Sequence, residues 1–196
     1  MRMELPKIYL ARHGETEWSV TGQHTGLTDL PLTARGERNA RQLGKRLKGL
    51  QFAAVFTSPL QRARRTCELA GFGDRAKVDA EMVEWNYGDY EGRRTADIRK
   101  ERPGWNLFRD GCPSGETAVQ VGARADRVIA RLRRVNGDAL VFGHRHWLSV
   151  LAVRWVGLPA EQGDILLLSE ASVSIVGYNH TVDESVIQLW NDSRYA

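Results

Sequence analysis

The chain has 196 residues, of which 42% are apolar and 27% are charged, and its net charge is +4. This length and composition are typical of a soluble globular protein and predict a single domain, 1–196, with a sizeable core. The sequence contains no run of 18 apolar residues, which excludes a transmembrane helix, and we expect no membrane partner.

The small excess of positive charge does not indicate a nucleic-acid partner. The 28 Lys and Arg residues are scattered among 24 Asp and Glu, and no basic tract or alternation of aromatic and basic residues stands out. Most of the arginines lie on expected amphipathic helices, where solvated faces are their usual place. A small anionic substrate explains the remaining positive charge better than a polyanion does.

Two features of the sequence bear on the compartment. The N-terminal stretch Met1–Lys7 is polar and leads directly into a strand, which is not the pattern of a signal peptide. Cys67 and Cys112 are too few for a disulfide scaffold, and neither has a neighbouring base that would make it a nucleophile. The expected location is therefore the cytoplasm.

Apolar runs alternate with amphipathic stretches along the chain. In order, we expect a strand at 7–11, a helix at 33–50, a strand at 52–56, helices at 60–70 and 117–135, a strand at 139–142, a helix at 147–156, and strands at 165–168, 172–178 and 186–190. This alternation predicts an α/β fold with three layers, α/β/α, around a mostly parallel central sheet. The segment 79–115, rich in Gly, Pro and aromatic residues, is expected to form a small loop-rich cap over a site.

Polar clusters stand at the ends of three expected strands: Arg12-His13-Gly14, then Ser58 with Arg62, then Gly143-His144. Ligands of open α/β sheets bind outside the carboxyl ends of the strands, so we expect these clusters to converge at one edge. Guanidinium groups bind phosphate oxygens in pairs, and a neutral imidazole can attack phosphorus. The clusters therefore predict a phosphoryl-binding site.

The same residues resemble the histidine phosphatase superfamily, whose members include cofactor-dependent phosphoglycerate mutases and many phosphatases. "ARHGET" looks like its signature, and "TSPLQRARRT", "EWNYGDYEG", "PSGET" and "VFGHRH" follow in the family's order, over roughly residues 7–148. The resemblance implies a phosphoglycerate mutase-like fold, a small phosphorylated metabolite as substrate, and no metal or other cofactor.

The resemblance also implies a catalytic set: His13, Arg12, Arg62, Glu84 and His144. His13 is expected to become a phosphohistidine, while the two arginines and His144 stabilise charge on the phosphoryl oxygens. Glu84 is expected to protonate the leaving alkoxide and then to accept a proton from water. This role requires a raised pKa, for which desolvation by nearby aromatic residues is the expected cause. Glu81 and Asp79 are neighbouring carboxylates that compete for the same role.

A narrower resemblance concerns the substrate. "TEWSVTGQHTGLTDLPLT", "RDGCPSGET" and "YNHTVDES" look like the sedoheptulose-1,7-bisphosphatase branch and related bacterial acid phosphatases. This implies a phosphatase that acts on sugar phosphates or bisphosphates, with substrate contacts from Ser19, Thr25, Gly26, Ser58 and Tyr87.

Two more residues are expected near the substrate. His24 lies in the loop beside the site. Arg145 stands where the family commonly has Gly, and Ser149 stands where close relatives carry an Arg that reaches a distal phosphate. Arg145 either replaces that cation or points to solvent, so the choice between monophosphate and bisphosphate stays open.

Three alternatives remain beside the phosphatase. A mutase is disfavoured because Ser19 and Thr95 stand where mutases carry Asn and Lys. A non-catalytic phosphate-binding protein is disfavoured by the intact catalytic set. His144 and His146 resemble a zinc pair, but no third ligand has suitable spacing. The oligomeric state is open, and a homodimer is among the states that the sequence allows.

Overall fold

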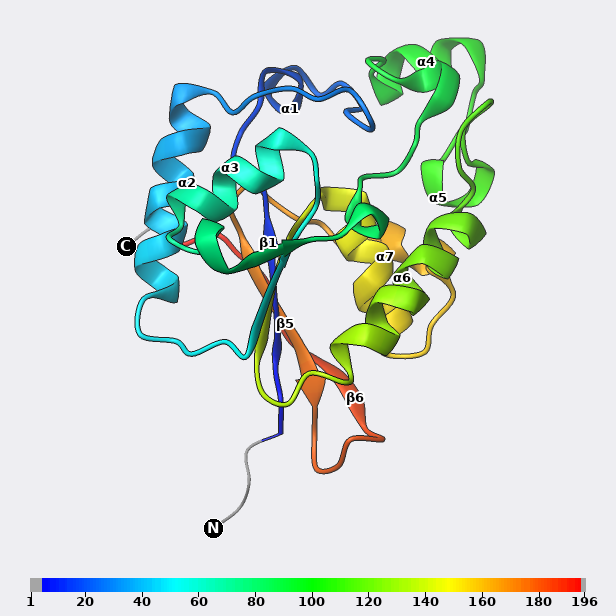
Figure 1. The fold of residues 1–196 in the computed structure, drawn as a ribbon. Helices are drawn as coiled ribbons and strands as arrows, with labels where there is room; N and C mark the ends of the chain where they lie inside the picture. The colour runs from blue at the N-terminus through cyan, green and yellow to red at the C-terminus, as the bar shows by residue number, and fades with distance from the viewer. Residues whose placement is uncertain (1–4, 195–196) are drawn as a thin grey trace.

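A six-stranded mixed sheet in the order β3-β2-β4-β1-β5-β6 forms the centre of the molecule (Figure 1). The computed structural model describes residues 5–194, so the first part of the polar N-terminal stretch, 1–4, lies outside the described residues, as do 195–196. The strands are β1 (Ile8–Arg12), β2 (Ala54–Thr57), β3 (Ala76–Val78), β4 (Ala139–Gly143), β5 (Val173–Tyr178) and β6 (Ser185–Asp192). The first four are mutually parallel, whereas β5 is antiparallel to both β1 and β6, which confirms a mostly parallel sheet.

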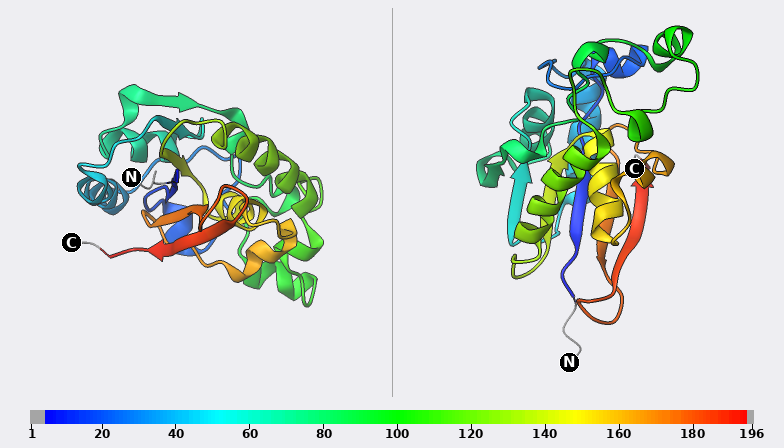
Figure 2. Two further views of the ribbon diagram at one scale, coloured as in Figure 1. Left: turned by 90° about the horizontal axis from the view of Figure 1, so that it is seen from below. Right: turned by 90° about the vertical axis from the view of Figure 1, so that its right-hand side faces the viewer.

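Helices cover both faces of the sheet. The pair α2 (Ala34–Leu47) and α3 (Gln61–Leu69) lies on one side of β1, and the pair α6 (Ala118–Leu132) and α7 (Arg145–Trp155) lies on the other, as Figures 1 and 2 show. The shorter helices are α1 (Glu17–Thr21), α4 (Thr95–Glu101) and α5 (Leu107–Asp110), with 3-10 turns η1 (Gly73–Arg75), η2 (Ala80–Met82), η3 (Gly88–Tyr90) and η4 (Ala160–Ile165). The three-layer α/β/α architecture is confirmed.

The alternation of side chains along β1 explains the two layers of core. Ile8 and Leu10 belong to the apolar cluster under α6 and α7, whereas Tyr9 and Ala11 belong to the cluster under α2 and α3. Successive strand residues point to opposite faces, so a strand that is covered on both sides is apolar throughout. All five residues of β1 are buried, including Arg12 at its carboxyl end.

The strand expected at 165–168 is wrong. Residues 160–165 form η4 instead, and 166–168 have no regular structure. The backbone carbonyls of Leu166, Leu167 and Leu168 accept hydrogen bonds from the side chains of Ser149, Trp190 and Arg12, respectively. These carbonyls therefore bond to side chains rather than to a neighbouring strand, which an apolar run cannot reveal.

The segment 79–115 contains more regular structure than expected. It includes η2, η3, α4 and α5, and it lies with α1 beside the carboxyl ends of the parallel strands (Figure 1). The short edge strand β3 and helix α1 were also not expected from the pattern, because each has too few residues to show a period. The assignment of one domain, and the role of 79–115 as a cap, stay predictions.

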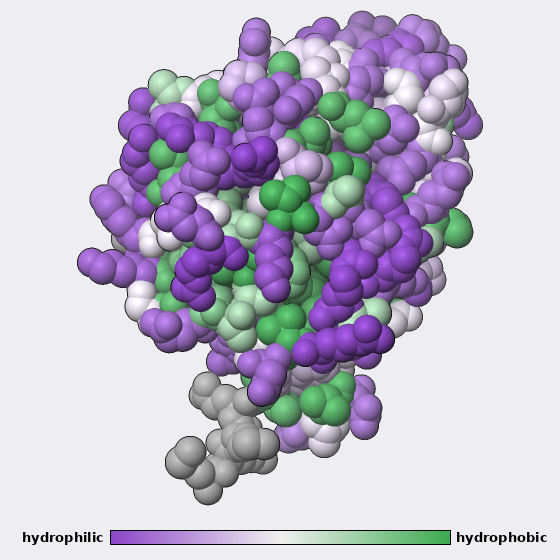
Figure 3. Space-filling model, viewed as in Figure 1, coloured by the Kyte–Doolittle hydropathy of each residue, from purple (hydrophilic) through white to green (hydrophobic). Residues whose placement is uncertain are grey.

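Charged side chains are spread over the surface and paired with one another. Figure 3 shows hydrophilic side chains over most of one face, with smaller apolar areas between them. Arg41 and Arg65 both pair with Glu37, and Arg131 pairs with Asp79. These arginines lie on solvated helix faces, as expected. Among the helices of residues 5–194, none is both long and apolar enough to cross a membrane.

Close contact between two glycines fixes the chain after β1. A Cβ added to Gly14 would approach the carbonyl of Gly36 to less than 3.0 Å, and a Cβ on Gly36 would approach the backbone of Glu15 equally closely. The absence of a side chain at Gly14 therefore lets the backbone after β1 pack directly against the first turn of α2. This contact positions the backbone next to His13.

We predict that Gly36→Ala lowers the free energy of unfolding by roughly 1–3 kcal/mol, because the added methyl group has no room. Urea unfolding of this variant, compared with Arg38→Ala at an exposed position of the same helix, measures the effect. Since alanine favours a helix interior over glycine, an unchanged or increased stability would show that α2 moves away from Glu15 at no cost.

Candidate active site

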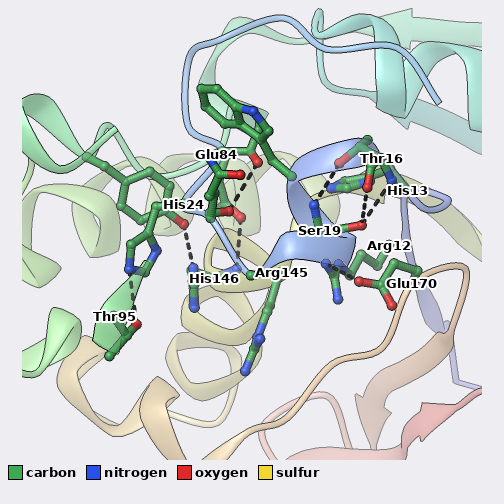
Figure 4. Close-up of a pocket in the computed structure, with 15 residues that line it drawn as sticks. Arg12, His13, Thr16, Ser19, His24, Glu84, Thr95, Arg145, His146 and Glu170 are labelled. Atoms are coloured by element: carbon green, nitrogen blue, oxygen red, sulfur yellow. Dashed lines mark hydrogen bonds and ion pairs between the residues drawn. The ribbon is translucent and has the colours of Figure 1, made fainter. Parts of the chain in front are cut away.

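A pocket opens at the carboxyl ends of the parallel strands (Figure 4). Its lining includes eight of the residues predicted from the sequence: Arg12, His13, Ser19, His24, Thr25, Glu84, Tyr87 and Arg145. Four others lie outside this lining: Gly26, Ser58, Arg62 and His144. Ser58, Arg62 and His144 are completely buried. The fold thus brings the pocket residues together from segments that are far apart in the chain.

His13 is held at the end of β1 by backbone and side-chain hydrogen bonds. Its N–H donates to the carbonyl of Gly143 at 3.0 Å, and its carbonyl accepts from the N–H of Ala171 at 3.1 Å. Its Nδ1 lies 2.7 Å from the carbonyl oxygen of Gly14. A carbonyl can only accept, so we assign the proton of the neutral ring to Nδ1, which leaves a lone pair on Nε2.

The charge state of His13 suits a nucleophile. Burial holds the pKa of His13 well below its usual value, and the positive charges of Arg62 and Arg12 lower it further. The hydrogen bond to Gly14 opposes this shift but does not reverse it. The imidazole is therefore neutral across the physiological range of pH.

Arg12 and Arg62 each use part of the guanidinium to bind the protein. Nη1 of Arg12 donates to the carbonyl of Leu168 at 2.6 Å, and Nη2 pairs with Oε1 of Glu170 at 2.9 Å. Arg62, on α3, donates to three backbone carbonyls, those of Thr25, Gly26 and Thr28. The buried Nε atom of each arginine has no acceptor among the described residues.

His144 follows β4, and its ring centroid lies 5.3 Å from that of His13. Its Nε2 is 2.8 Å from Oγ of Ser58, which also accepts the N–H of Leu60. The hydroxyl proton of Ser58 has no other recorded acceptor, so we assign it to His144 Nε2 and the ring proton of His144 to Nδ1. That buried Nδ1 also has no acceptor within residues 5–194. Ser58 therefore contacts His144 and does not line the pocket.

Glu84 accepts three backbone hydrogen bonds. Oε1 accepts from the N–H groups of Trp85 and Trp147, both at 2.9 Å, and Oε2 accepts from the N–H of His146 at 3.1 Å. Burial raises the pKa of Glu84, although these three bonds and the charge of Arg62 oppose the rise. Two of the donors lie in the first turn of α7, so the same contact fixes Glu84 beside His144.

The two competing carboxylates are engaged elsewhere. Burial alone would raise the pKa of Glu81, but its bonds to Arg127 and Arg131 outweigh burial and lower it. Asp79 accepts the N–H of Glu81 and pairs with Arg131. Neither carboxylate lines the pocket. Of the three, Glu84 alone combines a place in the pocket with a raised pKa.

A cluster of neutral side chains forms another part of the pocket. The hydroxyl of Tyr87 bonds to Nδ1 of His146, and burial both raises the pKa of Tyr87 and lowers that of His146. Both groups are therefore neutral, and the tautomer of His146 decides which of them donates. His24 lies 3.2 Å from the hydroxyl of Thr95, and burial followed by the charge of Arg145 lowers its pKa to about 4.

The remaining predicted residues have defined places. Arg145 lines the pocket, with no ion pair to its guanidinium among the described residues (Figure 4). The hydroxyl of Ser19 bonds to the backbone of Thr16 in the capping box of α1, at the pocket wall. Gly26 packs against Trp85 and Tyr87 so closely that a Cβ would clash. Its carbonyl accepts a hydrogen bond from Arg62, and Gly26 therefore lies behind the pocket.

Several lining residues were not among the site residues predicted from the sequence: Thr16, Gly22, Gln23, Thr95, His146 and Glu170. Glu170 precedes β5, and β5 begins at this edge because it is antiparallel to β1. A predicted direction for β5 is the signal that could have located it. No group of three or more His, Cys, Asp or Glu side chains in the described part of the chain could hold a metal ion.

Comparison with known proteins agrees with this geometry. The sequence model of the histidine phosphatase superfamily (branch 1) matches residues 8–193. The chain is 40% identical over 190 residues to sedoheptulose 1,7-bisphosphatase of Saccharomyces cerevisiae, covering 80% of this chain and 70% of that protein. It is 37% identical over 185 residues to an acid phosphatase of Mycobacterium tuberculosis, covering 92% and 91%.

A solved structure of an open reading frame product from Mycobacterium tuberculosis matches the fold with a TM-score of 0.90 and 36% identity, covering 96% of this chain and 99% of that one. The resemblance inferred from the motifs is thus confirmed over nearly the whole chain. The chain belongs to branch 1 of the histidine phosphatase superfamily and is a phosphoric monoester hydrolase.

Proposed function

We propose that the protein hydrolyses phosphomonoesters of small metabolites, namely sugar phosphates or bisphosphates, through a phosphohistidine at His13. One observation carries the proposal: three buried donors near the lone pair of His13 have no acceptor among the described residues, namely Nε of Arg12, Nε of Arg62 and Nδ1 of His144. Buried donors without acceptors are costly, and phosphoryl oxygens are acceptors that satisfy them.

In the first step, Nε2 of His13 attacks phosphorus and the bond between phosphorus and the ester oxygen breaks. Arg12, Arg62 and His144 stabilise the negative charge on the phosphoryl oxygens. The positive charge that the reaction needs comes from Arg12 and Arg62, while neutral His144 contributes a hydrogen bond, so the scheme uses no metal. Glu84 gives its proton to the leaving oxygen, which departs as an alcohol.

In the second step, the Glu84 carboxylate accepts a proton from water, and the water oxygen attacks phosphorus. The bond between phosphorus and His13 Nε2 breaks, orthophosphate leaves, and both side chains return to their starting states. Oε1 of Glu84 already accepts two N–H groups, whereas Oε2 accepts one. Oε2 is therefore the oxygen that exchanges the proton.

The leaving-group side of the pocket supports a hydroxylated substrate. His24, Tyr87 and His146 present neutral donors and acceptors, which suit the hydroxyl groups of a sugar. Arg145 adds a cation that can bind a second anionic group, which is why the proposal includes bisphosphates.

The cysteines are consistent with a cytoplasmic location, which we also propose. Cys67 and Cys112 are both free and buried. Burial raises the pKa of each thiol to about 12, so neither forms a reactive thiolate at neutral pH.

We predict that His13→Ala lowers the turnover of p-nitrophenyl phosphate by a factor on the order of 10³ or more, because the nucleophile is lost. Wild-type protein quenched during turnover should carry phosphate on His13, detectable by mass spectrometry. In a separate assay, the turnover rate of the wild-type protein should be unchanged by EDTA. His180→Ala, at an exposed histidine, is the matched control. Full activity of His13→Ala would refute the nucleophile assignment.

The second prediction concerns pH. Attack needs neutral His13, whose pKa is lowered, and leaving-group departure needs protonated Glu84, whose pKa is raised. The rate with a sugar phosphate should therefore fall on the alkaline side as Glu84 ionises. Glu84→Gln should reduce this rate by roughly 10²–10⁴-fold and remove the alkaline limb, whereas Glu81→Gln should preserve it. A wild-type rate that rises steadily to about pH 9, far above the ordinary carboxylate pKa, would contradict the role of Glu84.

The third prediction concerns the substrate. Across a panel of sugar monophosphates, sugar bisphosphates and phosphoglycerates, measured by phosphate release, sugar esters should show the highest kcat/KM. A mutase would instead interconvert phosphoglycerates in the presence of a bisphosphorylated primer and release little phosphate. A non-catalytic binding protein would release none.

A further inference from the structure

Glu170 is a pocket residue to which the mechanism above assigns no part. Its carboxylate pairs with Nη2 of Arg12 at 2.9 Å, and its side chain remains 32% exposed toward the pocket (Figure 4). A carboxylate is an unexpected neighbour for a site that binds phosphate, because the two negative charges repel each other. Its presence therefore calls for a physical explanation.

The segment that carries Glu170 is bonded to the catalytic strand on both sides of it. Before Glu170, the carbonyl of Leu168 accepts from Arg12 Nη1. After it, the N–H of Ala171 donates to the carbonyl of His13, and the carbonyl of Ser172 accepts the N–H of Arg12. Glu170 is thus placed relative to Arg12 and His13 by the backbone itself.

The backbone at Ala171 adds to this constraint. Ala171 is completely buried and has a φ of 51°, a conformation that residues other than glycine rarely adopt. Such a conformation persists where neighbouring contacts require it, and it occurs often at functional sites. Here the N–H of Ala171 donates to the carbonyl of His13, and the residue before it, Glu170, pairs with Arg12.

Four side chains with ionisable carboxyl or guanidinium groups line the pocket: Arg12, Arg145, Glu84 and Glu170. Because Glu84 holds a proton when the substrate binds in the proposed mechanism, Glu170 is the carboxylate that brings negative charge to this lining. A phosphate bound by Arg12 shares one guanidinium with Glu170, so the two anions lie within a few ångströms of each other. Glu170 repels the phosphate dianion of the substrate as well as that of the product. Tight binding of the product does not help the catalytic step, so the repulsion is useful where it weakens the binding of orthophosphate. A site with Arg12, Arg62 and two histidines would otherwise bind orthophosphate strongly.

We propose that Glu170 is a positioning residue for Arg12 whose negative charge also limits the affinity of the site for orthophosphate, so that the product leaves. The inference rests on the proposed phosphatase function. Position and charge can be separated by substitution. Glutamine at 170 keeps an oxygen that accepts from Nη2 of Arg12 but removes the charge, whereas alanine removes both.

The test measures binding of inorganic orthophosphate by titration calorimetry and its inhibition constant against p-nitrophenyl phosphate. Glu170→Gln should bind orthophosphate about tenfold more tightly, the size expected for loss of one partly screened repulsion, and should keep a higher kcat/KM than Glu170→Ala, because its amide oxygen still accepts from Arg12. Glu170→Ala should lose kcat/KM, because Arg12 is less well held. Glu161→Gln, an exposed position on η4 with the same change of charge, should match wild type in both measurements.

Equal orthophosphate affinity in wild type and Glu170→Gln would overturn the role of the charge. Equal kcat/KM in Glu170→Gln and Glu170→Ala would overturn the positioning role. Circular dichroism and urea unfolding of each variant separate these results from loss of the fold. Failure of the proposed function itself would look different, since wild-type protein would then release no phosphate and form no phosphohistidine, whatever its affinity for orthophosphate.

Discussion

The backbone hydrogen bonds of His13 are the contacts on which the rest of the site depends. Its N–H donates to the carbonyl of Gly143, the last residue of the parallel strand β4, and its carbonyl accepts from the N–H of Ala171, just before the antiparallel strand β5. Because β1 lies between these two strands, His144 arrives from one side and Glu170 from the other. His13, His144 and Glu170 are therefore positioned by hydrogen bonds to the ends of the central strands. A sheet is a stiff support, and such precision is what phosphoryl transfer requires.

Burial sets the protonation states in the site. It lowers the pKa of His13, His144 and His146 and raises that of Glu84, so the histidines are neutral and Glu84 is a weaker acid than an exposed glutamate. The positive charges of Arg12 and Arg62 act with burial on His13 but against it on Glu84. The backbone donors of α7 that fix Glu84 also oppose its protonation. The hydrogen bonds that fix the position of Glu84 thus lower its pKa, but burial outweighs them and the net shift of the pKa is upward.

Much of the fold and of the catalytic set could be predicted, because their signals are local. An apolar run followed by Arg12 and His13 marks a strand that ends at a site, and the helix that begins near Ser58 brings Arg62 to the same edge. Periodicity does not distinguish Arg62 from Arg64 and Arg65, yet the structure buries the first and exposes the other two. That distinction came from the motif. The prediction of a strand at 165–168 was wrong because the structure of this segment depends on distant contacts. Its carbonyls accept hydrogen bonds from side chains of three segments that are far away in the sequence.

From its amino-acid order alone, this chain could be assigned its α/β architecture and its membership of a phosphatase family, and His13 could be proposed as the nucleophile, because those follow from residue types at short spacing. Only the folded molecule decided that Ser58 contacts His144 and lies outside the pocket, that the pKa of Glu84 is raised whereas that of Glu81 is lowered, and that Glu170 pairs with Arg12. Each of these depends on burial or on contacts between residues far apart in sequence. Such contacts are set by strand direction and side-chain packing, and a one-dimensional pattern contains neither.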